Sequence, residues 1–201
     1  NQRLATLYTT FSQNLLADEE GHATAITDAK DLDGLPDSFR AALAAEAERR
    51  GQKRQWVVAN TRSSVEPFLT YSTRRDLREQ VWRRFISRGD HPGSRDNKPL
   101  ITEILQLRAE RAKLLGYTSH AHWRLENQMA KTPDRAIGLM EAVWKPALAR
   151  VREEVADMQK IADAEGAGFK IAPWDYRYYA EKVRQAKYDL DENQIKPYLQ
   201  L

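Results

Sequence analysis

Two long runs of helical periodicity in the second half of the chain constrain the fold most. In the first run, residues 99–115, apolar residues recur every three or four positions, and Gly116 follows as a C-terminal cap. The second run starts at Thr132-Pro133-Asp134, which supplies a capping hydroxyl, a first-turn proline and an acid near the helix dipole. It predicts a helix to about Ala164, with a kink at Pro146.

The remaining segments extend the helical prediction. Further helices are expected over residues 3–16, 36–51 and 118–128, and from Trp174 onward, with a last short turn at Pro197. Another is expected after Thr73, its predicted cap, with an apolar face that reaches Phe85. Only residues 55–60 read as a strand. The predicted fold class is all-α: a multi-helix bundle of long antiparallel helices, with at most one small two-stranded β element near residues 55–70. We expect a single helical domain or subdomain over 1–201, divisible into 1–90 and 97–201.

Composition excludes several classes of protein. Charged residues make up 30% and hydrophobic residues 41% of the chain, and no apolar run reaches the roughly 20 residues that a membrane-spanning helix needs. The 32 basic residues are interleaved with 29 acidic ones, whereas nucleic-acid binders concentrate basic charge on one face. The absence of cysteine excludes disulfides and fits a reducing compartment. We therefore expect a cytoplasmic protein with neither membrane nor nucleic acid as a partner.

The four histidines do not form a recognisable metal motif. His120 and His122 are two positions apart, so on a helix they point to different sides and cannot hold one zinc ion together. Helical zinc pairs need i, i+4 spacing, and neither His22 nor His91 has a histidine partner at that spacing. We therefore assign no metal ligand and no catalytic residue, and interpret these side chains as surface or capping histidines.

Aromatic residues gather in the last segment. Trp174, Tyr176, Tyr178 and Tyr179 stand close together in the sequence. A tyrosine joins a flat apolar face to a hydroxyl, which suits the wall of a peptide-binding channel. The alternative is that Trp174, Tyr178 and Tyr188 pack the last helix onto its neighbours, as an aromatic stripe at helical spacing commonly does.

Three stretches, in order along the chain, resemble those of a known family. The stretches are Asp96-Asn97 running on through Ile104-Leu105-Gln106-Leu107-Arg108 to Leu114-Leu115-Gly116-Tyr117, then Met129-Ala130-Lys131-Thr132-Pro133, and finally Trp174-Asp175, Tyr178-Tyr179, Leu190 and Pro197-Tyr198. Together they resemble the zinc metallopeptidases of the thimet oligopeptidase and peptidyl-dipeptidase family. The resemblance implies a mostly helical enzyme that cleaves short peptides in a deep channel. Its zinc is held by a His-Glu-x-x-His helix and a downstream glutamate.

No His-Glu-x-x-His motif occurs in this chain. The resemblance therefore implies the helical portion of a larger metallopeptidase, inactive by itself and without zinc of its own. We expect two partners: the missing catalytic lobe, and the short peptides that the full-length enzyme binds. An exposed apolar face would also favour self-association. The alternative function is a free-standing helical peptide-binding or interaction module. Peptide specificity, and the choice between dipeptide release and internal cleavage, stay open.

Overall fold

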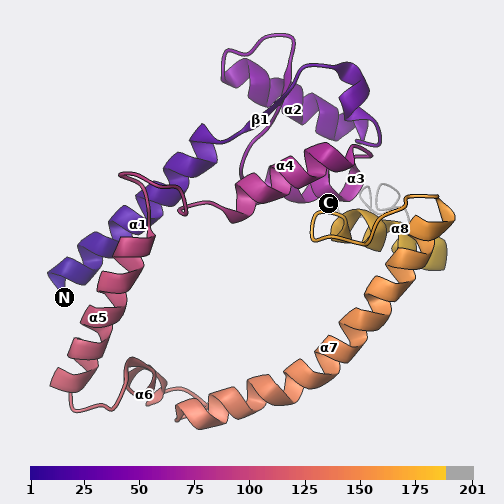
Figure 1. Cartoon of the computed structure of the whole chain (residues 1–201). Coiled ribbons are helices and arrows are strands. Elements are labelled where there is room, and N and C mark those ends of the chain that lie inside the picture. Colours follow the sequence, from indigo (N-terminus) through magenta and orange to yellow (C-terminus); the bar gives the residue numbers. More distant parts are fainter. Residues whose placement is uncertain (189–201) are drawn as a thin grey trace, which may run out of the picture. The chain divides into compact units, whose positions relative to one another are not determined.

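The computed structural model describes residues 1–188 of the 201, and helices dominate this part of the chain (Figure 1). The α-helices within it are α1 (Gln2–Gly21), α2 (Asp37–Arg49), α3 (Arg62–Tyr71), α4 (Arg75–Ile86), α5 (Lys98–Leu114), α6 (His120–Leu125), α7 (Pro133–Ala164) and α8 (Tyr176–Tyr188). The all-α prediction is thereby confirmed. The predicted turn at Pro197 lies outside the described residues.

The small β element consists of two three-residue strands. β1 (Thr24–Ile26) pairs antiparallel with β2 (Trp56–Val58), with Ala25 opposite Val57. The sequence predicted β2 correctly, but it did not indicate β1, because three residues are too few to show the alternation of a strand. Residues 62–71, which fall inside the region predicted for the β element, form α3 instead.

The chain forms two compact units, each assembled from segments distant in sequence. One unit contains residues 1–21 and 87–151, and the other contains residues 22–86 together with the described residues from 152 onward. The units interleave along the sequence, whereas the predicted subdomains, 1–90 and 97–201, are contiguous. That predicted division remains a prediction.

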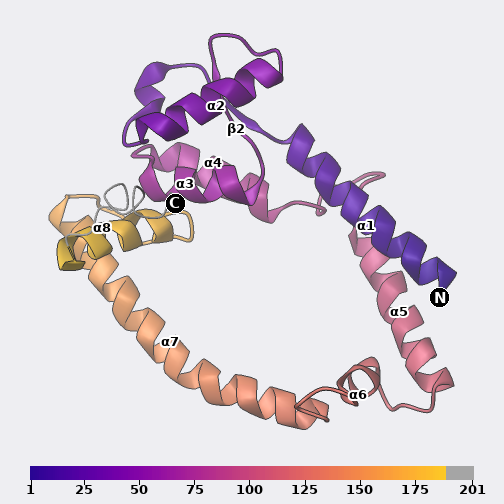
Figure 2. The same cartoon turned by 180° about the vertical axis from the view of Figure 1, so that it is seen from behind.

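In the unit that contains α2, α3 and α4, those helices and the strand β2 enclose the main core (Figure 2). Its buried members are Ile26, Leu32, Leu35, Leu43, Val58, Val65, Phe68, Leu69 and Val81. Thr73, predicted to cap α4, instead donates its hydroxyl to Asp33, and Ser72 accepts the amide of Arg74 ahead of the helix. A second cluster of Met158, Ala162 and Tyr179 joins the end of α7 to α8.

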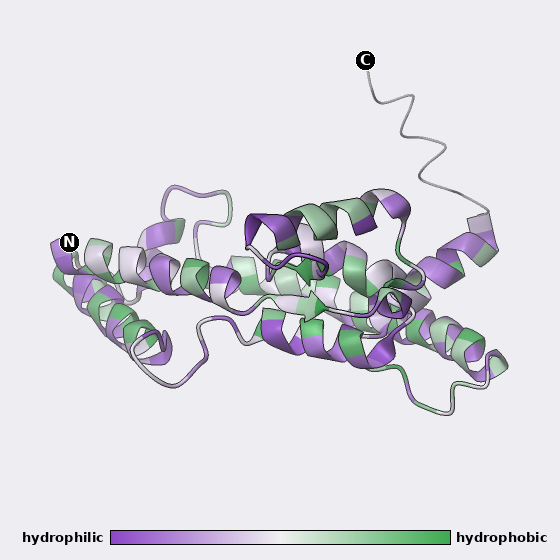
Figure 3. Cartoon of the chain, turned by 90° about the horizontal axis from the view of Figure 1, so that it is seen from above, coloured by the Kyte–Doolittle hydropathy of each residue, from purple (hydrophilic) through white to green (hydrophobic). Residues whose placement is uncertain are grey.

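In the other unit, α1 and α5 pack against each other in antiparallel directions. Asn14, late in α1, donates to Asn97 just before α5 at 2.8 Å, whereas Arg3 at the start of α1 contacts Glu103 further along α5. Leu4, Leu7 and Ile104 form the small core between the two helices. Figure 3 shows hydrophobic and hydrophilic residues alternating along the helical ribbons, as expected for amphipathic helices.

The longest element, α7, runs without interruption for 32 residues and contains Pro146 in its interior. It starts at Pro133, as the capping signal predicted, and contributes residues to both units. The predicted kink at Pro146 stays a prediction. No helix in the described part of the chain is both long and apolar enough to cross a membrane.

Candidate functional site

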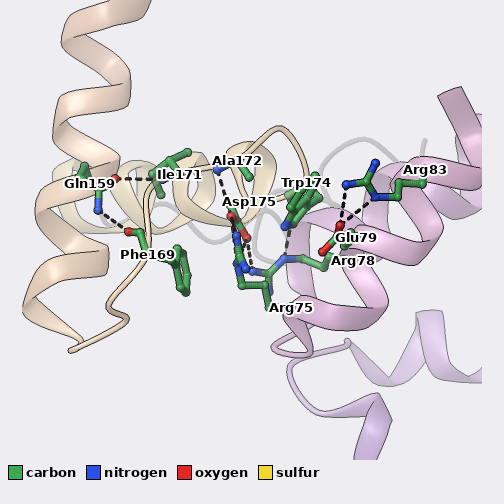
Figure 4. Close-up of polar contacts among 10 residues, drawn as sticks. All are labelled: Arg75, Arg78, Glu79, Arg83, Gln159, Phe169, Ile171, Ala172, Trp174 and Asp175. Carbon is green, nitrogen blue, oxygen red and sulfur yellow. Dashed lines mark hydrogen bonds and ion pairs between the residues drawn. The ribbon is translucent and has the colours of Figure 1, made fainter.

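The predicted aromatic segment begins at a buried carboxylate that attaches α8 to α4. Asp175 immediately precedes α8, and its side chain is fully buried. It accepts hydrogen bonds from Arg75 and Arg78, each with a shortest distance of 2.9 Å, and from the amide of Ala172 at 3.1 Å (Figure 4). A buried carboxylate is stable only when it is paired and hydrogen-bonded in this way.

The second arginine of this site is itself almost completely buried. Arg78 donates to the carbonyl oxygen of Ser72 at 2.7 Å and to that of Trp174 at 3.3 Å, in addition to Asp175. These carbonyl acceptors satisfy the guanidinium donors that the carboxylate does not reach. The start of α8 is therefore held against α4 by a closed polar network.

The loop between α7 and α8 is fixed from its other side by one glutamine. Gln159 of α7 donates to the carbonyl oxygen of Phe169 and accepts from the amide of Ile171, both at 2.9 Å (Figure 4). A glutamine side chain can both donate and accept hydrogen bonds. It thereby satisfies backbone carbonyl and amide groups that have no helix or strand partner in an irregular loop. Sequence reasoning missed Gln159, Arg75, Arg78 and Asp175 as anchors.

Trp174, Tyr178 and Tyr179 make ring contacts inside this unit. Trp174 meets the ring of Trp82 edge to face at a centroid distance of 5.6 Å, and Arg75 and Arg83 lie over its ring. The guanidinium of Arg78 lies over the ring of Tyr178, 4.2 Å from the ring centroid. These contacts match the packing interpretation of the stripe.

Tyr179 is the most deeply buried of the four predicted residues. Its ring contacts those of Tyr178 and Phe169, and it belongs to the cluster with Met158 and Ala162. Burial, assisted by the carboxylate of Glu165, raises the pKa of the Tyr179 hydroxyl above its ordinary value. Tyr188, which the packing interpretation included, is 72% exposed at the end of α8 and does not fit it.

Tyr176 packs against the same cluster and, unlike the other three, also lines an open groove between α3 and α8. The groove has a volume of about 700 Å³, within the range of small-ligand sites. Its wall carries Arg62, Glu66, Pro67, Thr70, Tyr71, Tyr176, Arg177, Glu181 and Arg184. The Tyr176 hydroxyl donates a hydrogen bond to the Glu154 carboxylate at 3.3 Å. Burial and this nearby carboxylate raise the pKa of Tyr176.

Charges of both signs line the groove, and they are paired. Arg62 and Arg177 both contact the carboxylate of Glu66, at 2.9 Å and 2.7 Å, and Arg184 contacts Glu181 at 2.7 Å. Such a surface offers donors and acceptors side by side next to two tyrosine rings. This combination suits a zwitterionic, peptide-like molecule better than a simple anion.

The histidines of α6 have structural roles. Ser119 caps the helix by accepting the amide of His122, and its hydroxyl lies 2.8 Å from Nδ1 of that residue. His120 meets Trp123 edge to face, and burial together with Arg108, Arg124 and Arg111 lowers the pKa of its imidazole. This arrangement agrees with the capping interpretation.

A further contact that sequence reasoning missed involves the loop after α4. The buried carboxylate of Asp18 accepts the amide of Gly89 at 2.6 Å, and Nε2 of His91 lies 3.9 Å from the same oxygen. Gly89 has a φ of +72°, and an added Cβ would lie 2.7 Å from the amide of Asn97. A glycine is therefore required where this loop meets α1.

Comparison with known proteins identifies the relatives of this chain. Residues 68–201 match the sequence pattern of Peptidase family M3. The chain is 35% identical over 202 residues to a dipeptidyl carboxypeptidase of Escherichia coli, covering all of this chain and 30% of that protein. It is 34% identical to oligopeptidase A of Salmonella typhimurium, covering 98% of this chain and 29% of the relative. A probable cytosolic oligopeptidase A of Arabidopsis thaliana is 33% identical over all of this chain. The chain spans about 30% of the length of these curated relatives.

Proposed function

Because the chain belongs to Peptidase family M3, we propose that it forms one helical wall of the peptide channel of a zinc-dependent oligopeptidase. The observation that supports this proposal is a similarity to peptidases that extends over the whole chain. The family predicted from the sequence motifs is confirmed at this level. We further propose a cytoplasmic location, since one relative is named as a cytosolic enzyme.

The zinc of such an enzyme would be held by residues outside this chain. The family's zinc helix needs two histidines at i, i+4, and His22, His91, His120 and His122 include no such pair. In α6, moreover, Nδ1 of His122 is already engaged with the hydroxyl of Ser119. The residues present do not fit this zinc-ligand motif, so no chemical step is assigned to a metal here.

What the chain's own residues would contribute is a rigid surface for peptide binding. Tyr176 and Tyr71 line the α3–α8 groove, and the buried Asp175 network fixes the start of α8 beside it. Precise placement of such a wall matters because small displacements in a substrate site reduce rate strongly. We therefore assign Tyr176 a substrate-contacting role, and Asp175 a positioning role.

The groove also supports the second candidate, a free-standing helical peptide-binding module. Its volume of about 700 Å³ and its mixed polar and aromatic wall suit peptide binding without any catalytic group. The two candidates differ in one respect, because only the module would bind peptides usefully without further polypeptide.

The purified chain distinguishes these candidates. We expect no hydrolysis of short peptides, no stoichiometric zinc, and no saturable peptide binding by calorimetry. Chelator-sensitive cleavage by the pure chain would contradict the assignment of catalysis to residues outside it. Saturable binding that Tyr176→Ala abolishes would favour the module. Tyr188→Ala is the matched control, since Tyr188 lies on the same helix but is mostly exposed.

A further inference from the structure

The first half of α7 carries an apolar surface that the described chain leaves uncovered. No residue of α7 between Pro133 and Val151 is buried, and the buried residues of this helix lie later, at Met158 and Ala162. We define the α7 face as the large apolar residues of this half, all of which are exposed: Ile137, Leu139, Met140, Val143, Trp144, Leu148 and Val151. Large apolar side chains gathered on an exposed surface commonly mark an interaction site.

The width of the α7 face indicates how many elements should cover it. With about 100° of rotation per residue, the seven side chains spread over roughly 180° of the helix, from Leu139 at one edge to Leu148 at the other. The narrow seam of a two-helix coiled coil uses only two positions in seven. The α7 face is wider than such a seam, so at least two packed elements are needed to bury it.

The comparison with relatives identifies which polypeptide could supply those elements. The whole of this chain, α7 included, aligns with about 30% of the E. coli dipeptidyl carboxypeptidase, so the corresponding segment of that protein belongs to a much larger polypeptide. A second copy of this chain would present one α7 to another and cover only a narrow seam on each. A larger lobe can present several elements at once.

We propose that the α7 face is the surface on which the catalytic remainder of the family M3 enzyme packs. This inference rests on the proposed function, and it names the part of the wall that joins the rest of the enzyme. By the same rotation, Met140 lies near the middle of the face, where a docking contact excludes water best.

The three methionines of the chain provide a residue-specific test. Met129 is 100% exposed, Met140 on the α7 face is 61% exposed, and Met158 is 3% exposed. Peroxide oxidation, followed by peptide mass spectrometry, measures how accessible each sulfur is. In the isolated chain, we expect Met140 to oxidise about as fast as Met129, and Met158 at least about tenfold more slowly.

The same measurement is then made in a longer protein, the E. coli dipeptidyl carboxypeptidase in which this chain replaces the matched segment. We expect Met140 to become at least about tenfold slower to oxidise while Met129 serves as the reference. An active swapped enzyme in which Met140 stays as reactive as in the isolated chain would overturn the docking proposal. A swapped enzyme that folds, binds zinc and is inactive would instead contradict the proposed function, so the two failures are distinguishable.

The isolated chain gives a second, independent test that needs no swapped enzyme. The triple variant M140Q/W144Q/L148Q should leave the melting temperature of the isolated chain unchanged, because these side chains contact little within it. A clear loss of stability would mean that the chain buries the face itself and would overturn the proposal. Protection of Met140 that appears only at high concentration, and that the triple variant removes, would assign the face to a second copy and overturn it equally.

Discussion

The two halves of α7 are both amphipathic, but they differ in what covers their apolar residues. The second half buries Met158 and Ala162 against Tyr179 of α8, and Gln159 fixes the loop that leads there. The first half buries nothing, although it carries Met140, Trp144 and five other large apolar residues. A continuous helix can therefore be a core element at one end and an unpartnered surface at the other. Periodicity reports amphipathicity, whereas burial depends on the polypeptide available to pack against.

The largest expected effect comes from breaking the network at the covered end. Asp175→Ala leaves the buried Arg78 without its carboxylate, which should cost about 3–5 kcal/mol of unfolding free energy. Urea denaturation of the isolated chain measures this change. Glu141→Ala is the control, since Glu141 is an exposed α7 residue and its loss should stay within about 0.5 kcal/mol. Similar small losses for both variants would show that the α4–α8 junction does not stabilise the unit.

A matched pair of truncations within α7 sharpens the comparison of its halves. Met158→Ala removes a buried side chain and should cost about 3 kcal/mol through lost burial and a residual cavity. Met140→Ala removes the same atoms from an exposed site and should change stability by less than about 0.5 kcal/mol. Both are read from the denaturant midpoint at constant m-value. Equal losses would remove the distinction between the two halves.

The smallest expected effect concerns the charge that links the second half of α7 to α8. A hydrogen bond from Lys187, with a second from Lys160, lowers the pKa of Asp157 to about 2 from its ordinary 3.8. A depressed carboxyl pKa stabilises the folded state above the unfolded pKa, and this contribution is lost as pH falls from about 3.8 towards 2.

Asp157→Asn should therefore lower the melting temperature at about pH 6 by less than about 3 °C, because the pair is exposed to solvent. The difference between wild type and variant should shrink at about pH 3. High salt should reduce it as well, since screening weakens a surface ion pair. A difference that grows on acidification would show that the stabilisation does not come from the ionised carboxylate.

The sequence was informative where local signals decide structure. The capping signal at Thr132-Pro133-Asp134 and the glycine at 116 predicted where α7 begins and α5 ends, because caps act within a few residues. The strand β1 was missed, since its three residues gain strand character only from pairing with β2.

The candidate site was less predictable for the same physical reason. Asp175 meets Arg75 and Arg78 across about a hundred residues of sequence, and no spacing rule connects them. The aromatic stripe was visible, but its residues differ in burial: Tyr179 is buried in the core, whereas Tyr176 is partly buried against that core and also lines the groove. Only packing against α3 and α7 separates the two roles.

The most direct test of the central claim is the peptidase activity of the E. coli dipeptidyl carboxypeptidase carrying this chain in place of its matched segment. The alignment covers 202 residues at 35% identity and nearly equal length, so the exchange leaves the rest of that enzyme unchanged. If this chain is a family M3 channel wall, the swapped enzyme should hydrolyse short peptides within about tenfold of the parent kcat/KM and lose activity to a chelator. A swapped enzyme that is folded and zinc-loaded but does not hydrolyse peptides would contradict the claim.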